Sequence, residues 1–190
     1  MRNIKLYGAT AIVLFAVALI GTYLETREWS TQKFPEIGVQ MKVPKVIKEG
    51  SINLDDKKAK VLFRGEVKKE DHGTPLLIIL RYEDGLRMPA TVSHLEIIPM
   101  LMMNLERAYP GRFPDYKKKS EKKFEYRGKK AAEVDFTYTG PAGEMIKQRF
   151  LMVEYDGDTA LYFSAQAREE DFEKLNKKYF NRMFSSIRFK

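Results

Sequence analysis

The feature that most limits how this chain can fold is an apolar run near its start. Residues 6–24 hold nineteen consecutive uncharged side chains, rich in Ala, Ile, Val and Leu. A helix rises about 1.5 Å per residue, so this run would cover about 28 Å, close to the roughly 30 Å hydrocarbon core of a bilayer. We therefore expect one transmembrane helix within residues 1–24. A buried globular helix is disfavoured, because the run has no polar face.

The charges around this run predict its orientation. Arg2 and Lys5 precede it, whereas Glu25, Arg27 and Glu28 follow it with a net charge of −1. Positive charge favours the cytoplasmic side, so we expect the rest of the chain to be extracytoplasmic. A cleaved signal peptide is the alternative, with residues 16–18 (Ala-Val-Ala) as a small-residue cleavage site. Cleavage there would leave apolar residues on the new N-terminus, which favours an uncleaved anchor.

The composition excludes several kinds of functional site. The chain has no cysteine and two histidines among 190 residues, which rules out disulfides, Cys-bearing zinc sites, thiol nucleophiles and iron–sulfur clusters. His72 and His94 are isolated, so they do not form a three-ligand metal site by themselves. We find no Gly-rich phosphate loop and no G-x-S-x-G motif. We therefore expect no cofactor, no metal and no enzymatic activity.

Beyond the anchor, the sequence predicts a short tether at residues 25–35 and one domain at residues 36–190. Alternating or continuous apolar patterns predict strands, and the Asp156-Gly157 pair predicts a hairpin turn. The predicted strands are residues 38–43, 58–67, 75–82, 132–139, 145–155 and 159–167.

Two helices are expected to pack on this sheet. Apolar residues from Phe172 to Ile187 recur at offsets 0, 3, 7, 8, 11, 12 and 15, which indicates one amphipathic helix. Ser93 and Glu96 have capping-box spacing within a second candidate, residues 91–108, although Pro99 would kink it or delay its start. The fold class is therefore α+β: an antiparallel β-sheet covered by helices, preceded by one transmembrane helix.

The C-terminal half resembles a known superfamily. Tyr126-Arg127-Gly128 is followed by residues 130–136 (KAAEVDF), residues 148–150 (QRF), Asp156-Gly157 and a closing helix that ends in residues 184–189 (FSSIRF). This order is similar to the PsbP/Mog1-like superfamily, in particular its bacterial DcrB-like and DUF1795 members. The resemblance implies an antiparallel sheet flanked by helices and, for many members, export. It also implies accessory or binding roles without a shared catalytic motif.

The most concentrated charge lies in residues 112–130, which contain nine Lys or Arg and three acidic residues. One interpretation is an electropositive hairpin that docks onto an envelope protein or another anionic surface. The other is a solvated edge whose lysines prevent strand-to-strand aggregation. Aromatic interleaving also suits nucleic acid, but the expected location disfavours that partner. The candidate binding residues are Lys117, Lys118, Lys119, Lys122, Lys123, Arg127, Lys129 and Lys130.

The methionines near position 100 are a second candidate feature. Met88, Met100, Met102 and Met103 could bind Cu(I), but core packing or an adaptable contact surface is favoured because the stretch is apolar all round. The leading hypothesis is a non-enzymatic, membrane-anchored extracytoplasmic accessory or binding module. A small-ligand carrier, with a cavity between the sheet and the Met-rich helix, and an envelope enzyme with a polar site are the alternatives.

Overall fold

A computed structural model describes residues 28–49, 59–67, 76–83, 86, 97–156 and 159–190. The expected transmembrane helix in residues 1–24 lies outside the described residues, as do His72, Met88 and His94. Within the described ranges, no helix is long and apolar enough to cross a membrane. These residues divide into two compact units, residues 47–185 and a smaller one that combines residues 28–46 with 186–190.

The smaller unit is built on a three-stranded antiparallel sheet. Its strands are β1 (Trp29–Phe34), β2 (Val39–Pro44) and β10 (Arg188–Phe189), in the order β1-β2-β10. The 3₁₀ helix η1 (Pro35–Ile37) joins the first two and ends at Gly38, whose φ of 63° is accessible to glycine without strain.

Strand β1 corrects the sequence prediction of a tether at residues 25–35. Trp29 pairs with Pro44 and Phe34 with Val39, and both aromatic side chains are buried. The run of Ser, Thr, Gln and Lys between them hid the strand, because polar side chains on both faces leave no apolar alternation.

The larger unit contains a seven-stranded antiparallel sheet with the order β3-β4-β5-β9-β8-β7-β6. Its members are β3 (Lys48–Glu49), β4 (Ala59–Val67), β5 (Leu76–Glu83), β6 (Lys117–Tyr126), β7 (Lys129–Thr139), β8 (Met145–Asp156) and β9 (Thr159–Arg168). The six predicted strands are confirmed as β2, β4, β5, β7, β8 and β9. Asp156 pairs with Thr159, which confirms the predicted β8–β9 hairpin, although residues 157–158 of its turn lie outside the described part.

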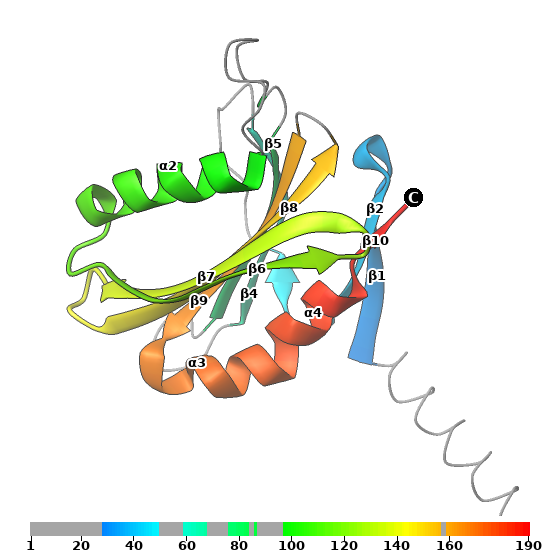
Figure 1. Ribbon diagram of the computed structural model, residues 1–190. Helices are drawn as coiled ribbons and strands as arrows, with labels where there is room; N and C mark the ends of the chain where they lie inside the picture. The colour runs from blue at the N-terminus through cyan, green and yellow to red at the C-terminus, as the bar shows by residue number, and fades with distance from the viewer. Residues whose placement is uncertain (1–27, 50–58, 68–75, 84–85, 87–96, 157–158) are drawn as a thin grey trace, which may run out of the picture. The chain divides into compact units, whose positions relative to one another are not determined.

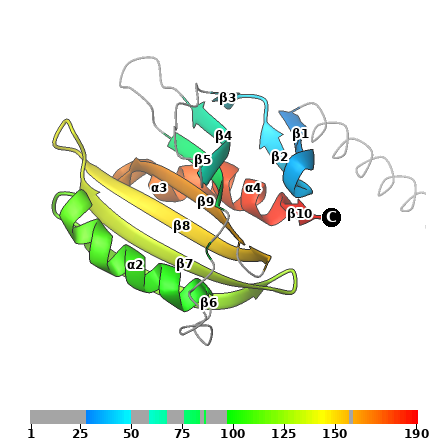
Figure 2. The same ribbon diagram turned by 90° about the horizontal axis from the view of Figure 1, so that it is seen from above.

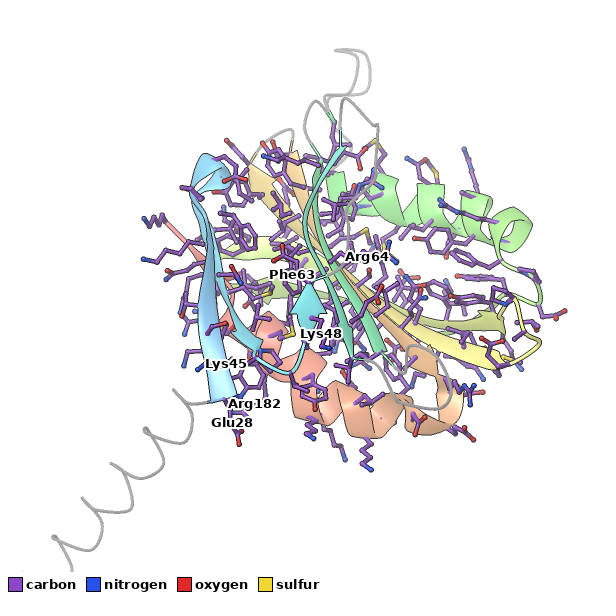
Figure 3. The ribbon with its side chains drawn as sticks, turned by 180° about the vertical axis from the view of Figure 1, so that it is seen from behind. Glu28, Lys45, Lys48, Phe63, Arg64 and Arg182 are labelled. Carbon is purple, nitrogen blue, oxygen red and sulfur yellow. The ribbon has the colours of Figure 1, made fainter. Side chains whose placement is uncertain are left out.

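Strand β4 illustrates how alternation separates the two faces of this sheet. Phe63 is 2% exposed, whereas its neighbour Arg64 forms an ion pair with Glu66 at 3.1 Å. Figure 3 labels Phe63 and Arg64 on this strand. On Phe63's face Gly65 leaves no room for a side chain, because an added Cβ would contact Ile47 and lie 2.6 Å from the Phe63 ring.

Helices cover both faces of the sheet in this unit (Figures 1 and 2). Helix α2 (Ile97–Arg112) lies on one face and packs Ile98, Leu101 and Met102 against β7, β8 and β9. It overlaps the second predicted helix, and Pro99 falls in its first turn, where a missing N–H leaves no bond unmade. The capping-box residues Ser93 and Glu96 lie outside the described residues.

The other face is covered by α3 (Glu169–Leu175) and α4 (Asn181–Ser186), joined by the π-helical segment η3 (Asn176–Phe180). The predicted amphipathic helix is confirmed in its buried stripe but is not uniformly α-helical. Phe180 is fully buried and its ring stacks on Phe163 of β9 at 4.8 Å. The structure thus has the predicted α+β class, an antiparallel sheet between helices.

Candidate functional site

The predicted basic segment folds into the β6–β7 hairpin at one edge of the seven-stranded sheet. Tyr126 pairs with Lys129, and the two residues between them, Arg127 and Gly128, have φ values of 52° and 75°. Two positive φ values give the tight turn that matches the twist of a hairpin. Strand β6 has no neighbour on its outer side among the described residues, so the segment lies at an edge of the sheet, as the solvated-edge interpretation expects.

The candidate lysines do not form one uniform patch, because β6 alternates between two faces. Lys118 and Lys123 lie opposite Phe136 and Ala132, on the α2 side of the sheet. Lys122 lies opposite Glu133, on the side covered by α3. An irregularity between Lys118 and Ser120 interrupts the alternation.

Three of the candidate lysines are paired with acidic side chains from outside the segment. Lys118 Nζ lies 2.5 Å from Glu106 of α2, Lys119 Nζ 3.5 Å from Glu169 of α3, and Lys122 Nζ 2.8 Å from Glu133 of β7. The hydrogen bond to Glu106 raises the pKa of Lys118, and the same bond lowers the pKa of Glu106. These lysines fasten the hairpin to α2, α3 and β7, which reduces the positive charge available to a partner.

The side chains of Arg127 and Lys129 donate hydrogen bonds to backbone carbonyls. Arg127 Nη2 donates to the carbonyl of Ser185 at 2.9 Å, while Tyr126 Oη donates to the carbonyl of Phe184 at 2.6 Å. A cation at the end of a helix also interacts favourably with its dipole. Lys129 Nζ donates to the carbonyl of Tyr155 and lies 4.9 Å from the centre of its ring. The tip of the hairpin therefore caps α4.

Two exposed cations, Lys117 and Lys123, are the members of the predicted set that stay available. Neither forms an ion pair with another side chain in the described part of the chain. Lys130 is also exposed on β7. The basic surface that the structure leaves for a partner is thus smaller than the sequence run suggests.

A second candidate site, a cavity of about 300 Å³, lies between α2 and the sheet. This is where the sequence placed the cavity of the small-ligand alternative. The methionines of α2 divide among three environments: Met102 is buried in the core, Met100 lines the cavity, and Met103 is 39% exposed. The cavity is lined by Arg81, Glu83, Leu86, Met100, Leu101, Asn104, Leu105, Ala108, Tyr109, Arg112, Phe150, Met152 and Tyr162.

Polar groups accompany the apolar lining of this cavity. Arg81 Nη2 lies 3.1 Å from Glu83 Oε2, and its guanidinium is 5.7 Å from the centre of the Tyr162 ring. Burial raises the pKa of Tyr109 to about 12, although the nearby charges of Arg112 and Arg81 act in the opposite direction. Tyr109 is therefore a neutral hydrogen-bond donor at physiological pH.

The face of the sheet under α3 holds a charged network that sequence reasoning missed. Glu133 and Asp135 of β7 are 8% and 5% exposed, although such alternation with Val134 and Phe136 is typical of a strand with one solvated face. Arg149 of β8 binds Asp135 through two hydrogen bonds of 2.7 Å. The missed signal was the Gln148-Arg149-Phe150 sequence on the adjacent strand, because Arg149 is directly opposite Asp135 in the register.

No group of three or more His, Asp or Glu side chains in the described ranges is arranged to hold a metal ion. The shallow hollow bordered by Glu144, Met145, Arg168, Glu169 and Glu170 is rich in acids but lacks such a cluster.

Comparisons with known proteins show a PsbP/Mog1-like fold. No protein-family model and no curated protein sequence matches the chain. The cyanobacterial PsbP (CyanoP) of Synechocystis matches with a TM-score of 0.58 and 9% identity, over 86% of this chain and 93% of that one. The Ran-binding protein Mog1p of Saccharomyces cerevisiae matches with a TM-score of 0.52 and 10% identity, over 85% and 95%. LpqN of Mycobacterium tuberculosis, involved in cell envelope biogenesis, matches with a TM-score of 0.50 and 14% identity, over 84% and 83%.

Proposed function

We propose that this chain is a non-enzymatic, extracytoplasmic accessory or binding module of DcrB-like or DUF1795 type. Residues 6–24 anchor it in the membrane, and the outer edge of the β6–β7 hairpin docks onto an anionic surface of an envelope component. The observation that carries the proposal is the exposure of β6, because Lys117–Lys123 form an unbroken run of seven exposed residues in this ten-residue strand.

The charge on this edge supports an anionic partner. Lys117 and Lys123 are exposed and form no ion pair among the described residues, although the charge of Lys123 also acts on Glu106 of α2. Pairs between exposed charges contribute about 0.2–1 kcal/mol each and weaken as salt rises. Docking through these two lysines would be weak and sensitive to salt, which suits an accessory role.

The fold is compatible with a binding role in the envelope. LpqN is described as involved in cell envelope biogenesis, and CyanoP is a PsbP protein. Because identities of 9% and 14% establish the fold alone, the role is carried over as an analogy.

The test compares two double variants of the full chain in native membranes. Lys117→Gln/Lys123→Gln removes the free cations of the edge, whereas the control Lys174→Gln/Lys177→Gln removes two exposed cations from α3 and η3. After gentle solubilisation, a stoichiometric partner should co-purify with wild type and the control at low salt. Its recovery with the edge variant should fall a few-fold to about tenfold, as expected for two exposed ion pairs.

A second arm separates a protein partner from a lipid surface. Full-length chain reconstituted at the same density is mixed with vesicles that contain either neutral or 30% anionic phospholipid. Clustering with the anionic vesicles that depends on Lys117 and Lys123 identifies lipid as the surface. Equal behaviour of wild type, the edge variant and the control in both arms would refute docking through this edge.

A further inference from the structure

The cavity under α2 combines an apolar body with a cationic rim. Its floor consists of side chains from three strands, Arg81 and Glu83 of β5, Phe150 and Met152 of β8, and Tyr162 of β9. Its volume of about 300 Å³ lies at the lower end of the range typical of small-molecule sites, roughly 300–1,000 Å³. The ligand that fits is therefore compact.

Helix α2 supplies the opposite wall through residues at a spacing of four. Met100, Asn104, Ala108 and Arg112 recur on one side of the helix and line the cavity from one end to the other. Met100 provides an adaptable apolar contact at one end, and Arg112 provides a guanidinium at the other. The small side chain of Ala108 keeps the wall open between them.

Neighbouring aromatic rings fix the position of Tyr109, which lines the cavity. The Tyr109 ring packs against Phe113 at 5.0 Å, Phe136 at 5.1 Å and Phe150 at 6.3 Å, so its position is set from several sides. The Phe150 and Tyr162 rings lie 5.5 Å apart. A flat apolar group that enters the cavity would meet these rings and the thioethers of Met100 and Met152.

The charge of the lining favours an anion. Arg81 and Arg112 supply two guanidiniums, whereas Glu83 is the carboxylate of the lining and already interacts with Arg81. Arg81, Arg112 and Tyr109 line the same cavity, and both arginines act electrostatically on the Tyr109 hydroxyl, a neutral donor. Such a group of donors recognises a carboxylate through charge-assisted hydrogen bonds.

We propose that this cavity binds a compact amphipathic carboxylate, with its carboxylate at Arg112, Arg81 and Tyr109 and its apolar body against Phe150, Met152 and Met100. The proposal is independent of docking through the β6–β7 hairpin, because none of the hairpin lysines lines the cavity. It assigns the chain a second binding function, the capture of a small amphipathic acid.

The experiment uses the full chain in lipid nanodiscs, with empty nanodiscs as the blank. Titration calorimetry measures binding of 3-phenylpropionate and octanoate, and of 3-phenylpropan-1-ol as the neutral counterpart of the first acid. We expect saturable binding of at least one acid, and binding of the alcohol that is at least about tenfold weaker. Loss of a hydrogen bond to a charged group costs about that factor or more.

Three variants locate the site. Arg112→Gln should weaken binding of the acid by about tenfold, whereas Arg107→Gln, the same charge change at an exposed position of α2 outside the cavity, should leave it unchanged. Ala108→Trp should fill the cavity and abolish binding while circular dichroism shows an intact fold. Absence of saturable binding of both acids to folded wild type, equal affinity for the alcohol, or equal losses in Arg107→Gln and Arg112→Gln would each overturn the proposal.

Discussion

The buried charge network under α3 allows the sharpest test of how this fold is held together. Arg149 binds Asp135 through two hydrogen bonds of 2.7 Å, and the side chains are 15% and 7% exposed. Its Nε also lies 3.7 Å from Glu133, and its guanidinium lies 5.9 Å from the centre of the Phe172 ring of α3. Replacing Arg149 by Met would keep the apolar stem but leave Asp135 buried without its main partner.

Removal of one member of a buried ion pair costs about 3–5 kcal/mol. Two lysines reduce this cost, since Lys147 Nζ lies 3.9 Å from Asp135 and Lys122 Nζ lies 2.8 Å from Glu133. We therefore expect the free energy of unfolding to fall by about 3 kcal/mol, the lower end of that range. For a chain of this size the midpoint temperature would fall by about 6–12 °C.

The assay is urea unfolding of the full chain in a mild non-ionic detergent, followed by far-UV circular dichroism. The double variant Arg149→Met/Asp135→Leu serves as the control, because replacing both partners by apolar groups is often neutral. It should recover at least half of the loss caused by Arg149→Met alone. A loss below about 1 kcal/mol in the single variant, or a double variant that is less stable than the single one, would contradict the reasoning.

Two further predictions concern the faces of the same sheet. The pKa of Tyr109 is raised to about 12 by burial, so its contribution to stability is complete below the ordinary tyrosine pKa of about 10 and is lost as pH rises through about 12. Wild type should therefore lose stability between pH 10 and pH 12 more steeply than Tyr109→Phe, as measured by urea unfolding at each pH; parallel losses would refute this. Gly65→Ala should destabilise the fold by about 1–2 kcal/mol, because its Cβ would contact Ile47 and lie 2.6 Å from the buried Phe63 ring. Phe63→Leu in the same chain should relieve part of that cost, and a fully additive loss would argue against the clash.

The strands were predictable because their signals are local. The alternation in residues 159–167, the nearly unbroken apolar run of residues 75–82 and the Asp156-Gly157 turn each depend on neighbouring residues. The structure confirms the strands that they predict, β9, β5 and the β8–β9 hairpin. Strand β1 carries no such pattern, and its pairing with β2 decides its conformation. The π-helical segment Asn176–Phe180 likewise leaves the apolar stripe of the C-terminal helix intact, so periodicity alone does not reveal it.

The burial of the polar side of β7 was not predictable from its alternation, because that pattern separates the two faces of a strand without showing whether the polar face is exposed to water. Glu133, Asp135 and Thr137 are all buried, since a helix and the side chains of Lys147 and Arg149 cover them. The polar face of an inner strand can be buried when cations from an adjacent strand form ion pairs with its carboxylates. Arg149 at the register position opposite Asp135 provides this compensation, and only the pairing of β7 with β8 reveals it.

A run of basic residues in the sequence can likewise overstate the positive charge of a binding surface. Residues 112–130 carry a large positive excess along the sequence, but Glu106, Glu133 and Glu169 approach three of the lysines from other elements. Arg127 and Lys129 are engaged by backbone carbonyls that lie 58 and 26 residues away. A count of charges along the chain is thus an upper bound on the charge that a partner meets. Lys117 and Lys123 are exposed and form no ion pair among the described residues. They are therefore the residues at which a docking function is best tested.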